Sequence, residues 1–245
     1  MVRSMRNAKI RLCVTQALGA GQTIPLTRDQ AHYLFGVMRI KQGAHVLLFN
    51  SADGEYLAEV VEAGKRKGVL KCLSQTRPLQ MPPDLWLLFA PIKKARTAFI
   101  VEKATELGVA RISPVQTRFT NTERIRQDRL QAHALEAAEQ CGATYVPEVD
   151  DIRRLDAVLD DWPEDRQLVF CDESLAGAQE VLPAQAGQQK WAILIGPEGG
   201  FGMDERARLS ALPFVSGISL GPRILRADTA AVAAITLWQA SLGDW

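Results

Sequence analysis

The chain has 245 residues, of which 47% are hydrophobic and 23% are charged. This ordinary globular composition excludes collagen-like, disordered and coiled-coil proteins, and the length allows one large domain or two modest ones. No apolar run reaches the roughly 18 to 20 residues of a membrane-spanning helix, and the basic start of the chain lacks the apolar core of a secretory signal. We therefore expect a cytoplasmic protein without membrane contact.

The net charge of +1 hides an uneven distribution along the chain. Residues 1–78 carry 12 Lys/Arg and 5 Asp/Glu, whereas residues 79–245 carry 17 Lys/Arg and 23 Asp/Glu. Such asymmetry favours a first part that faces a polyanion. Attraction between the two oppositely charged parts is the alternative explanation.

In the first part, the pattern predicts one helix and several short strands. Thr27 can cap a helix over 27–38, because apolar residues follow it at helical spacing. Asp53-Gly54 is a strong hairpin signal between two apolar runs. The predicted strands lie at 44–50, 55–61 and 69–73. Short strands joined by tight turns favour a small β-barrel.

A proline-rich stretch at 77–84 separates this part from the second, because three prolines there cannot continue a helix or a central strand. We place the domains at 1–78 and 79–245. After the boundary, strands are predicted at 85–90, 111–115, 168–171, 191–195 and 215–220, and helices at 94–107, 130–141, from about 204, and at 227–240. This alternation is typical of an α/β domain with a parallel sheet.

No metal site is predicted. The three histidines stand far apart and no two cysteines form a CxxC pair, so clustered ligands are missing. The cysteines are interpreted as buried thiols, and they are Cys13, Cys72, Cys141 and Cys171.

Two loops follow predicted strands at the edge where ligands bind in open α/β sheets. The loop at 195–202 has four glycines in seven residues, which lets its main chain approach a ligand, although it fits neither common phosphate-binding motif. The loop at 220–229 places two arginines and Asp228 before an alanine-rich helix. The structural alternatives are a tight strand-to-helix turn for the first loop and a salt-bridged helix cap for the second.

Four strings resemble the RsmE family of small-subunit ribosomal RNA uridine-N3 methyltransferases, in the SPOUT superfamily. They are VEKATELGV at 101–109, EAAEQCG at 136–142, IGPEGG at 195–200 and LGPRILR at 220–226. The resemblance covers nearly the whole chain, including Phe49-Asn50 and Gly54-Glu55. One departure is Ala227-Asp228-Thr229, where the family usually has Thr-Glu-Thr.

The resemblance implies a PUA-like RNA-binding β-barrel followed by a SPOUT methyltransferase domain whose C-terminal segment threads a trefoil knot. It implies S-adenosylmethionine as cofactor, 16S ribosomal RNA in the small ribosomal subunit as substrate, and a homodimer. The apolar segment 230–238 agrees with a dimer, since a helix that is apolar on most sides needs cover, although burial within one chain is the alternative.

The resemblance also implies functional residues. The cofactor would bind to Ile195, Gly196, Pro197, Glu198, Gly199, Gly200, Leu220, Gly221, Ile224 and Leu225, and a side chain at Gly199 should block it. Arg226 could stabilise the uracil anion that develops as N3 loses its proton, and Asp228 or Glu198 could accept that proton.

Predicted RNA contacts are basic residues of the first domain and one arginine of the second loop. They are Arg3, Arg6, Arg11, Arg39, Lys41, Lys65, Arg66, Lys67 and Arg223. Two other functions stay open: a SPOUT enzyme that methylates a ribose 2′-oxygen, and a non-enzymatic RNA-binding assembly factor.

Overall fold

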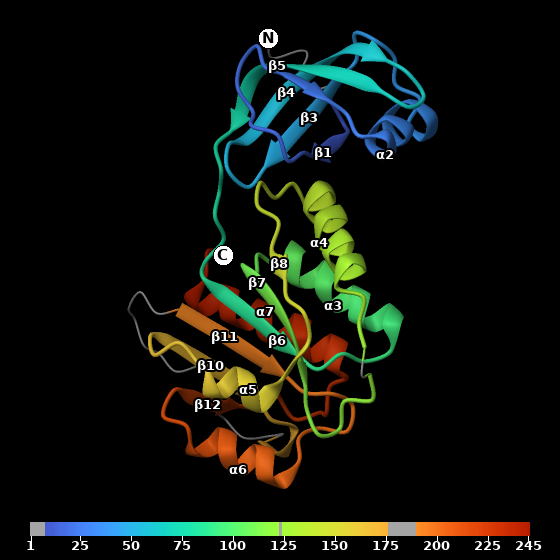
Figure 1. Cartoon of the computed structure of the whole chain (residues 1–245). Coiled ribbons are helices and arrows are strands. Elements are labelled where there is room, and N and C mark those ends of the chain that lie inside the picture. The colour runs from blue at the N-terminus through green and yellow to red at the C-terminus, as the bar shows by residue number, and fades with distance from the viewer. Residues whose placement is uncertain (1–7, 123, 176–189) are drawn as a thin grey trace. The chain divides into compact units, whose positions relative to one another are not determined.

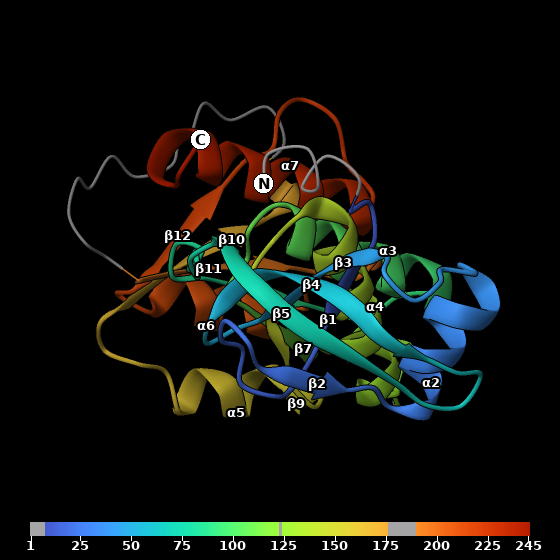
Figure 2. The same cartoon turned by 90° about the horizontal axis from the view of Figure 1, so that it is seen from above.

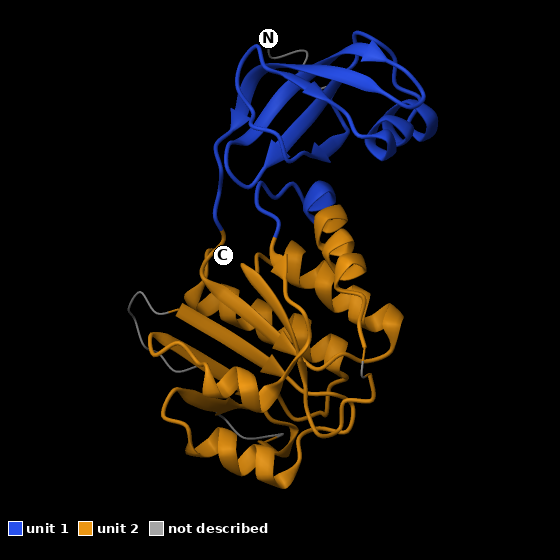
Figure 3. Ribbon diagram, in the orientation of Figure 1, with its two compact units in different colours: residues 1–81, 138–146 blue, residues 82–137, 147–245 orange. Residues whose placement is uncertain are grey.

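The computed structural model describes residues 8–122, 124–175 and 190–245. The chain divides into two compact units (Figure 3), and each is considered by itself below. Unit 1 comprises residues 1–81 and 138–146, and unit 2 comprises residues 82–137 and 147–245. Unit 1 thus ends within the predicted proline-rich boundary, but it also takes in residues 138–146, which the sequence pattern assigns to the second domain.

Unit 1 is built on one curled five-stranded sheet with the strand order β1-β3-β4-β5-β2 (Figures 1 and 2). Its strands are β1 (Arg11–Cys13), β2 (Thr23–Pro25), β3 (His45–Asn50), β4 (Gly54–Ala63) and β5 (Gly68–Arg77). The predicted barrel is therefore a curled sheet with β1 and β2 as its edges. β1 and β2 were not predicted, because three residues are too short for a periodic pattern.

The β3–β4 hairpin forms where the Asp-Gly signal predicts it, and Asn50 pairs with Gly54. Gly54 has φ +81°, and a Cβ there would lie 2.5 Å from the carbonyl oxygen of Arg77. Glycine is therefore required at this turn for both its conformation and its lack of a side chain.

The helix predicted over 27–38 is present, but only its first turn is an α-helix. Thr27 caps α2 (Arg28–Ala31) through a capping box with Gln30, and the chain continues as the π-helix η1 (His32–Val37). Arg39 follows with φ +54°, a left-handed conformation that is uncommon for residues other than glycine.

Unit 2 contains a parallel sheet with the order β12-β10-β11-β6-β7-β8, and β9 pairs separately with β7 (Figure 1). The strands are β6 (Leu85–Phe89), β7 (Arg111–Gln116), β8 (Glu148–Val149), β9 (Arg153–Arg154), β10 (Arg166–Cys171), β11 (Lys190–Ile195) and β12 (Val215–Ile218). The central strands are almost continuously buried, which explains their apolar runs.

Helices cover both faces of this sheet. α3 (Lys94–Glu106) and α7 (Ala227–Leu242) pack against each other, and α7 contacts β11. α5 (Leu155–Asp160) and α6 (Met203–Ala211) add Leu159 and Leu209 to a core with Leu168 and Leu194 of the sheet. α4 (Gln127–Cys141) runs from unit 2 into the segment that belongs to unit 1. The predicted α/β architecture is confirmed, and the threading of a knot stays a prediction.

Two smaller expectations have different outcomes. Cys72 is buried as predicted, whereas Cys141 is exposed, so the interpretation of all four cysteines as buried thiols is wrong for Cys141. No helix in the described parts of the chain is both long and apolar enough to cross a membrane.

Candidate functional site

A pocket of about 190 Å³ lies at the carboxyl ends of three neighbouring strands of unit 2. Its base is formed by the last residues of β10, β11 and β12, which are Cys171, Ile195 and Ile218. The walls are completed mainly by two loops, one after β11 and one after β12, and the residues directly after β10 contribute as well. In open parallel sheets this edge is where ligands bind, so the fold itself selects the pocket as the candidate site.

The loop after β11 needs its glycines because side chains fill the space around them. A Cβ on Gly196 would lie 2.5 Å from the ring of Phe201, which is buried and packs edge-on against Phe170 at 4.8 Å between ring centroids. Gly200 has φ +68°, and a Cβ there would collide with the carboxylate of Glu173. These contacts fix the course of the loop past the pocket.

The loop after β12 ends at Arg226, which is the N-cap of α7 and whose carbonyl oxygen accepts a hydrogen bond of 2.7 Å from the N–H of Ala230. In the described parts of the chain, no group accepts a hydrogen bond from the main-chain N–H of Leu220, Ile224 or Leu225. These donors lie among apolar side chains that line the pocket.

Apolar walls with unpaired main-chain donors are suited to a purine ring, which offers both a flat apolar surface and hydrogen-bond acceptors. The residues present therefore fit the adenine of S-adenosylmethionine. Nine of the ten positions predicted to bind the cofactor line the pocket, and Gly199 is the exception. A Cβ on Gly199 would contact the Phe119 side chain at 3.1 Å, which lies outside the pocket lining, and the expectation that a side chain there blocks the cofactor stays a prediction.

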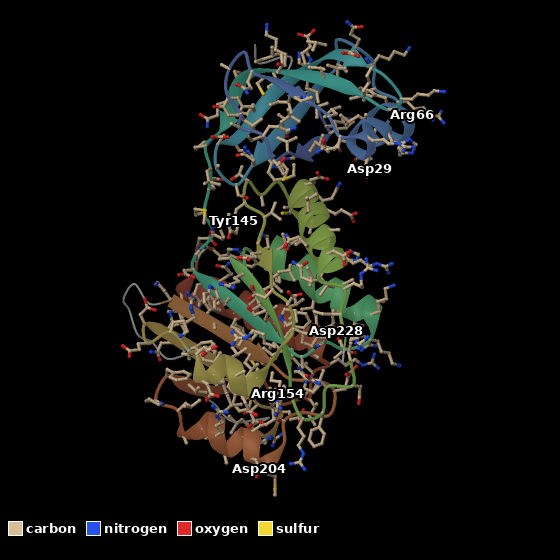
Figure 4. All side chains as sticks on the ribbon, in the orientation of Figure 1. Asp29, Arg66, Tyr145, Arg154, Asp204 and Asp228 are labelled. Carbon is tan, nitrogen blue, oxygen red and sulfur yellow. The ribbon has the colours of Figure 1, made fainter. Side chains whose placement is uncertain are left out.

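The predicted catalytic residues are not all brought together. Glu198 and Arg226 are exposed residues that line the pocket, and Arg223 lines it as well. Among the described residues, none of these three side chains forms an ion pair within 4 Å. Asp228 lies in the first turn of α7 (Figure 4), outside the pocket lining, and its carboxylate is 3.7 Å from Nη1 of Arg96.

The sequence pattern did not single out the acidic residues after β10, although the carboxyl end of a buried strand was the available signal. Asp172 and Glu173 both line the pocket. Arg206 of α6 lies 3.6 Å from the Asp172 carboxylate and donates a hydrogen bond of 3.1 Å to Glu173. Burial raises the pKa of the neighbouring Cys171 thiol to about 12, so this thiol stays protonated and is not a nucleophile at neutral pH.

The predicted RNA contacts of unit 1 fall into three groups. Arg3 and Arg6 lie outside the described residues. The second group has exposed side chains and comprises Arg39, Lys41, Lys65, Arg66 and Lys67. Within it, Lys67 also pairs with Glu62 at 3.0 Å. Arg11 is different, and the structure removes it from the set of RNA contacts.

Arg11 is a structural residue of unit 1. Its guanidinium donates to the Glu55 carboxylate at 2.7 Å and to the carbonyl oxygens of Ala138, Glu139 and Ala143. Four of its five N–H groups are engaged in this way and the side chain is only 10% exposed, so it is not presented to a phosphate. Burial alone would raise the pKa of Glu55, but hydrogen bonds from Arg77, Arg11 and a threonine hydroxyl outweigh it, and the pKa is lowered.

Comparisons with known proteins agree with the fold. The RNA methyltransferase domain family matches residues 80–239, and the RNA methyltransferase PUA domain family matches residues 26–71. The ribosomal RNA small subunit methyltransferase E of Rickettsia conorii is 29% identical over 92% of this chain and 93% of its own length. The protein of the same name from Bacillus subtilis is 25% identical over 90% of this chain and 91% of its own length.

Solved structures extend this likeness to three dimensions. The ribosomal RNA small subunit methyltransferase E of Neisseria gonorrhoeae, bound to S-adenosylmethionine, matches with a TM-score of 0.86 at 26% identity and covers 96% of this chain and 99% of its own. A Legionella pneumophila protein in complex with the same cofactor matches with a TM-score of 0.87 at 29% identity, and the match covers 96% of this chain and 99% of that protein's chain.

The fold and the pocket thus define a two-domain RNA methyltransferase, in which a PUA domain precedes the α/β methyltransferase domain. The full-length likeness narrows this class further. The chain belongs to the RsmE family of ribosomal RNA small subunit methyltransferases.

Proposed function

We propose that this protein transfers a methyl group from S-adenosylmethionine to N3 of a uridine in small-subunit (16S) ribosomal RNA. The observation that carries the proposal is the pocket at the carboxyl ends of β10, β11 and β12, where apolar walls and unpaired main-chain donors meet Arg226 at the rim. The small-subunit substrate is supported by the names of the full-length relatives.

In this proposal the cofactor is held mainly by main-chain groups. Leu220, Ile224 and Leu225 offer N–H donors to the adenine, and Ile195 and Ile218 supply apolar surface. When bound, S-adenosylmethionine supplies a methyl group that its sulfonium already activates, so the protein needs no nucleophile of its own. Its task is to bind the two substrates, orient them and manage charge and protons.

Uracil N3 carries a proton that must leave before the nitrogen can accept a methyl group. Arg226 is positioned to stabilise the negative charge that develops on the uracil oxygens. Glu198 and Asp228 are the candidate bases. The pocket lining favours Glu198, because Asp228 lies outside it and pairs with Arg96. In this arrangement Asp228 acts as a positioning residue at the start of α7, close to Arg226.

RNA affinity is proposed to come in part from the exposed cations of unit 1. Arg39 and Lys41 are both exposed, and Arg39 keeps a left-handed backbone that glycine would adopt more easily. Such a conformation in a long basic residue is consistent with a functional requirement for its side chain. The basic turn at 65–67 offers further phosphate contacts.

A homodimer is part of the proposal. Ile224, which lines the pocket, is 75% exposed and Leu237 on α7 is 47% exposed, so the single chain leaves apolar surface uncovered at both places. A second copy would cover such surface. Light scattering on the purified protein should give twice the chain mass of 27.0 kDa at micromolar concentration, and a mass of one chain would contradict the dimer.

Transfer of labelled methyl groups tests the proposed activity. Purified protein and labelled S-adenosylmethionine are mixed with small-subunit particles that lack the modification, and large-subunit particles serve as the control acceptor. The proposal predicts incorporation into the small-subunit RNA alone. Calorimetry with S-adenosylmethionine distinguishes the proposed enzyme from a non-enzymatic assembly factor, because the assembly factor is predicted not to bind S-adenosylmethionine.

A further inference from the structure

Phe119 is a large aromatic residue on the outside of unit 2. It belongs to the loop that follows β7 at the carboxyl edge of the sheet, and it is 43% exposed. An aromatic side chain gains more from burial than most others, so an exposed one beside a functional pocket calls for a reason.

The ring lies against the glycine-rich loop of the pocket. A Cβ on Gly199 would lie 3.1 Å from Cβ of Phe119 and 3.5 Å from Cγ. Gly199 stands between Glu198 and Gly200, which both line the pocket. Phe119 is therefore one residue away from the pocket wall, on the outer side of the loop.

The loop that carries Phe119 is fixed at several points. The N–H of Thr117, a buried residue, donates to the Thr120 hydroxyl at 2.9 Å, which closes a tight local turn. The N–H of Arg118 donates to the Glu205 carboxylate at 2.8 Å. Thr122 donates to the carbonyl oxygen of Ile92 at 3.4 Å. The ring is thus presented by a pre-organised turn, which lowers the entropic cost of binding a partner.

Positive charge accompanies the ring. The Arg118 guanidinium lies 5.8 Å from the centroid of the Phe119 ring, and its side chain is 60% exposed. Its ion pair with Asp204, at 3.6 Å, joins two exposed side chains and is therefore weak. Lys93 and Lys94, both exposed, follow the residue that Thr122 contacts.

We propose that Phe119 stacks on the base next to the target uridine while Arg118 binds the adjoining phosphate. The inference rests on the proposed function and adds a binding site for the flanking nucleotide. A uridine that enters the pocket leaves its stacked neighbours, and the exposed neighbouring base then needs a new stacking partner. Exposed aromatic rings beside basic side chains are the usual means of holding single-stranded RNA.

Steady-state methylation of small-subunit particles tests this site. Phe119→Ala is compared with Phe99→Ala, a matched control, because Phe99 on α3 is 39% exposed and has Lys103 Nζ at 5.6 Å from its ring centroid. Phe119→Ala should raise KM for the particles roughly five- to a hundredfold, the range that one lost base stack produces. kcat and the calorimetric affinity for S-adenosylmethionine should stay at wild-type values, because stacking contributes equally before and during the reaction. Phe99→Ala should behave as wild type.

Two further variants separate stacking from simple apolar packing. Phe119→Tyr should keep the wild-type KM, whereas Phe119→Leu should resemble Phe119→Ala. Provided that the wild-type protein methylates the particles, two results would overturn the proposal. One is an unchanged KM in Phe119→Ala, and the other is a wild-type KM in Phe119→Leu. Absence of methylation by the wild-type protein would instead refute the proposed function itself.

Discussion

Two groups of arginines, one in each unit, show how differently the same charge can be used. In unit 1 the guanidinium of Arg11 is buried, and Glu55 and three carbonyl oxygens occupy its donors. In unit 2 Arg226 and Arg223 are exposed at the pocket, and no described carboxylate lies within 4 Å of either. The first arginine stabilises a fold, whereas the other two are available to a substrate.

This difference limits what net charge can say about function. The excess of positive charge in residues 1–78 includes Arg11 and Arg77, and both pair with the same Glu55 carboxylate at 2.7 Å. Two of the cations counted in that excess are therefore engaged with Glu55 inside unit 1. The acidic second unit, in contrast, presents unpaired arginines where the chemistry is proposed to take place.

The largest effect is expected from Glu55→Gln, which should act on stability and not on the pocket. The change leaves the Arg11 charge buried without its partner, and breaking a buried ion pair in this way costs about 3–5 kcal/mol. Thermal unfolding of the variant should begin at a much lower temperature, while the affinity for S-adenosylmethionine at low temperature stays unchanged. Glu62→Gln, which removes an exposed pair with Lys67, is the matched control and should change little.

The same pair gives unit 1 a defined response to acid. Because the pKa of Glu55 is lower in the folded than in the unfolded chain, its contribution to stability is full above the unfolded pKa of about 4.5. That contribution is lost as the pH falls through the lowered folded pKa. The wild-type protein should therefore lose more stability than Glu55→Gln between about pH 5 and pH 3. Equal losses in the two proteins would contradict the assignment.

Arg226→Ala should produce the opposite pattern, with intact stability and slow chemistry. Loss of a pre-organised donor to a developing anion costs roughly 10²–10³ in rate. Single-turnover methylation of small-subunit particles with saturating S-adenosylmethionine isolates this step. Arg226→Lys should also be impaired, because lysine keeps the charge but loses the planar fork. A near-wild-type rate for Arg226→Ala would move attention to Arg223 and Glu198.

Glu198→Gln and Asp228→Asn sharpen the choice of base. If Glu198 accepts the N3 proton, Glu198→Gln should lower the single-turnover rate by roughly 10²–10⁴ at neutral pH. Asp228→Asn should have a smaller effect, since its carboxylate pairs with Arg96 outside the pocket lining. The reverse order of the two effects would assign the base to Asp228.

Reversal of two exposed charges in unit 1 should weaken RNA binding more moderately. Arg39→Glu combined with Lys41→Glu removes two proposed phosphate contacts. The negative slope of log affinity against log salt concentration should therefore become shallower by about 2. RNA affinity is measured at several salt concentrations, and cofactor binding serves as the control. An unchanged slope would show that these side chains do not contact phosphates.

The smallest effect is expected from Gly199→Ala. The added methyl group contacts Phe119 and not the cofactor pocket, so the affinity for S-adenosylmethionine should stay within about twofold, well under the tenfold that 1.4 kcal/mol represents. KM for small-subunit particles should rise, but less than in Phe119→Ala, because the ring can shift without being lost. A strong loss of affinity for S-adenosylmethionine would instead show that a side chain at Gly199 interferes with the cofactor.

Elements with a strong periodic pattern were predictable from the sequence, and those fixed by distant partners were not. The hairpin at Asp53-Gly54, the buried strand β6 and helix α3 follow from turn chemistry and apolar spacing. The two-residue strand β8 is too short to carry a pattern. The membership of residues 138–146 in unit 1 depends on contacts such as that of Arg11 with Ala143, across many residues of sequence.

The candidate site shows the same division. The two loops were predictable because each follows a buried strand of a parallel sheet. The burial of Arg11 and the pairing of Asp228 with Arg96 were not, because a sequence does not show which carboxylate an arginine will meet. The identity of the cofactor was predicted from the likeness to a family. Which of the proposed residues reach the pocket depends on side-chain packing, which the sequence does not show.

The position of the methyl group on the product tests the central claim most directly. RNA from small-subunit particles methylated by this protein is digested to nucleosides and separated by chromatography with mass spectrometry. The account predicts 3-methyluridine, in an amount that depends on Arg226 and on added S-adenosylmethionine. A 2′-O-methylated nucleoside, or no methylated nucleoside at all, would contradict it.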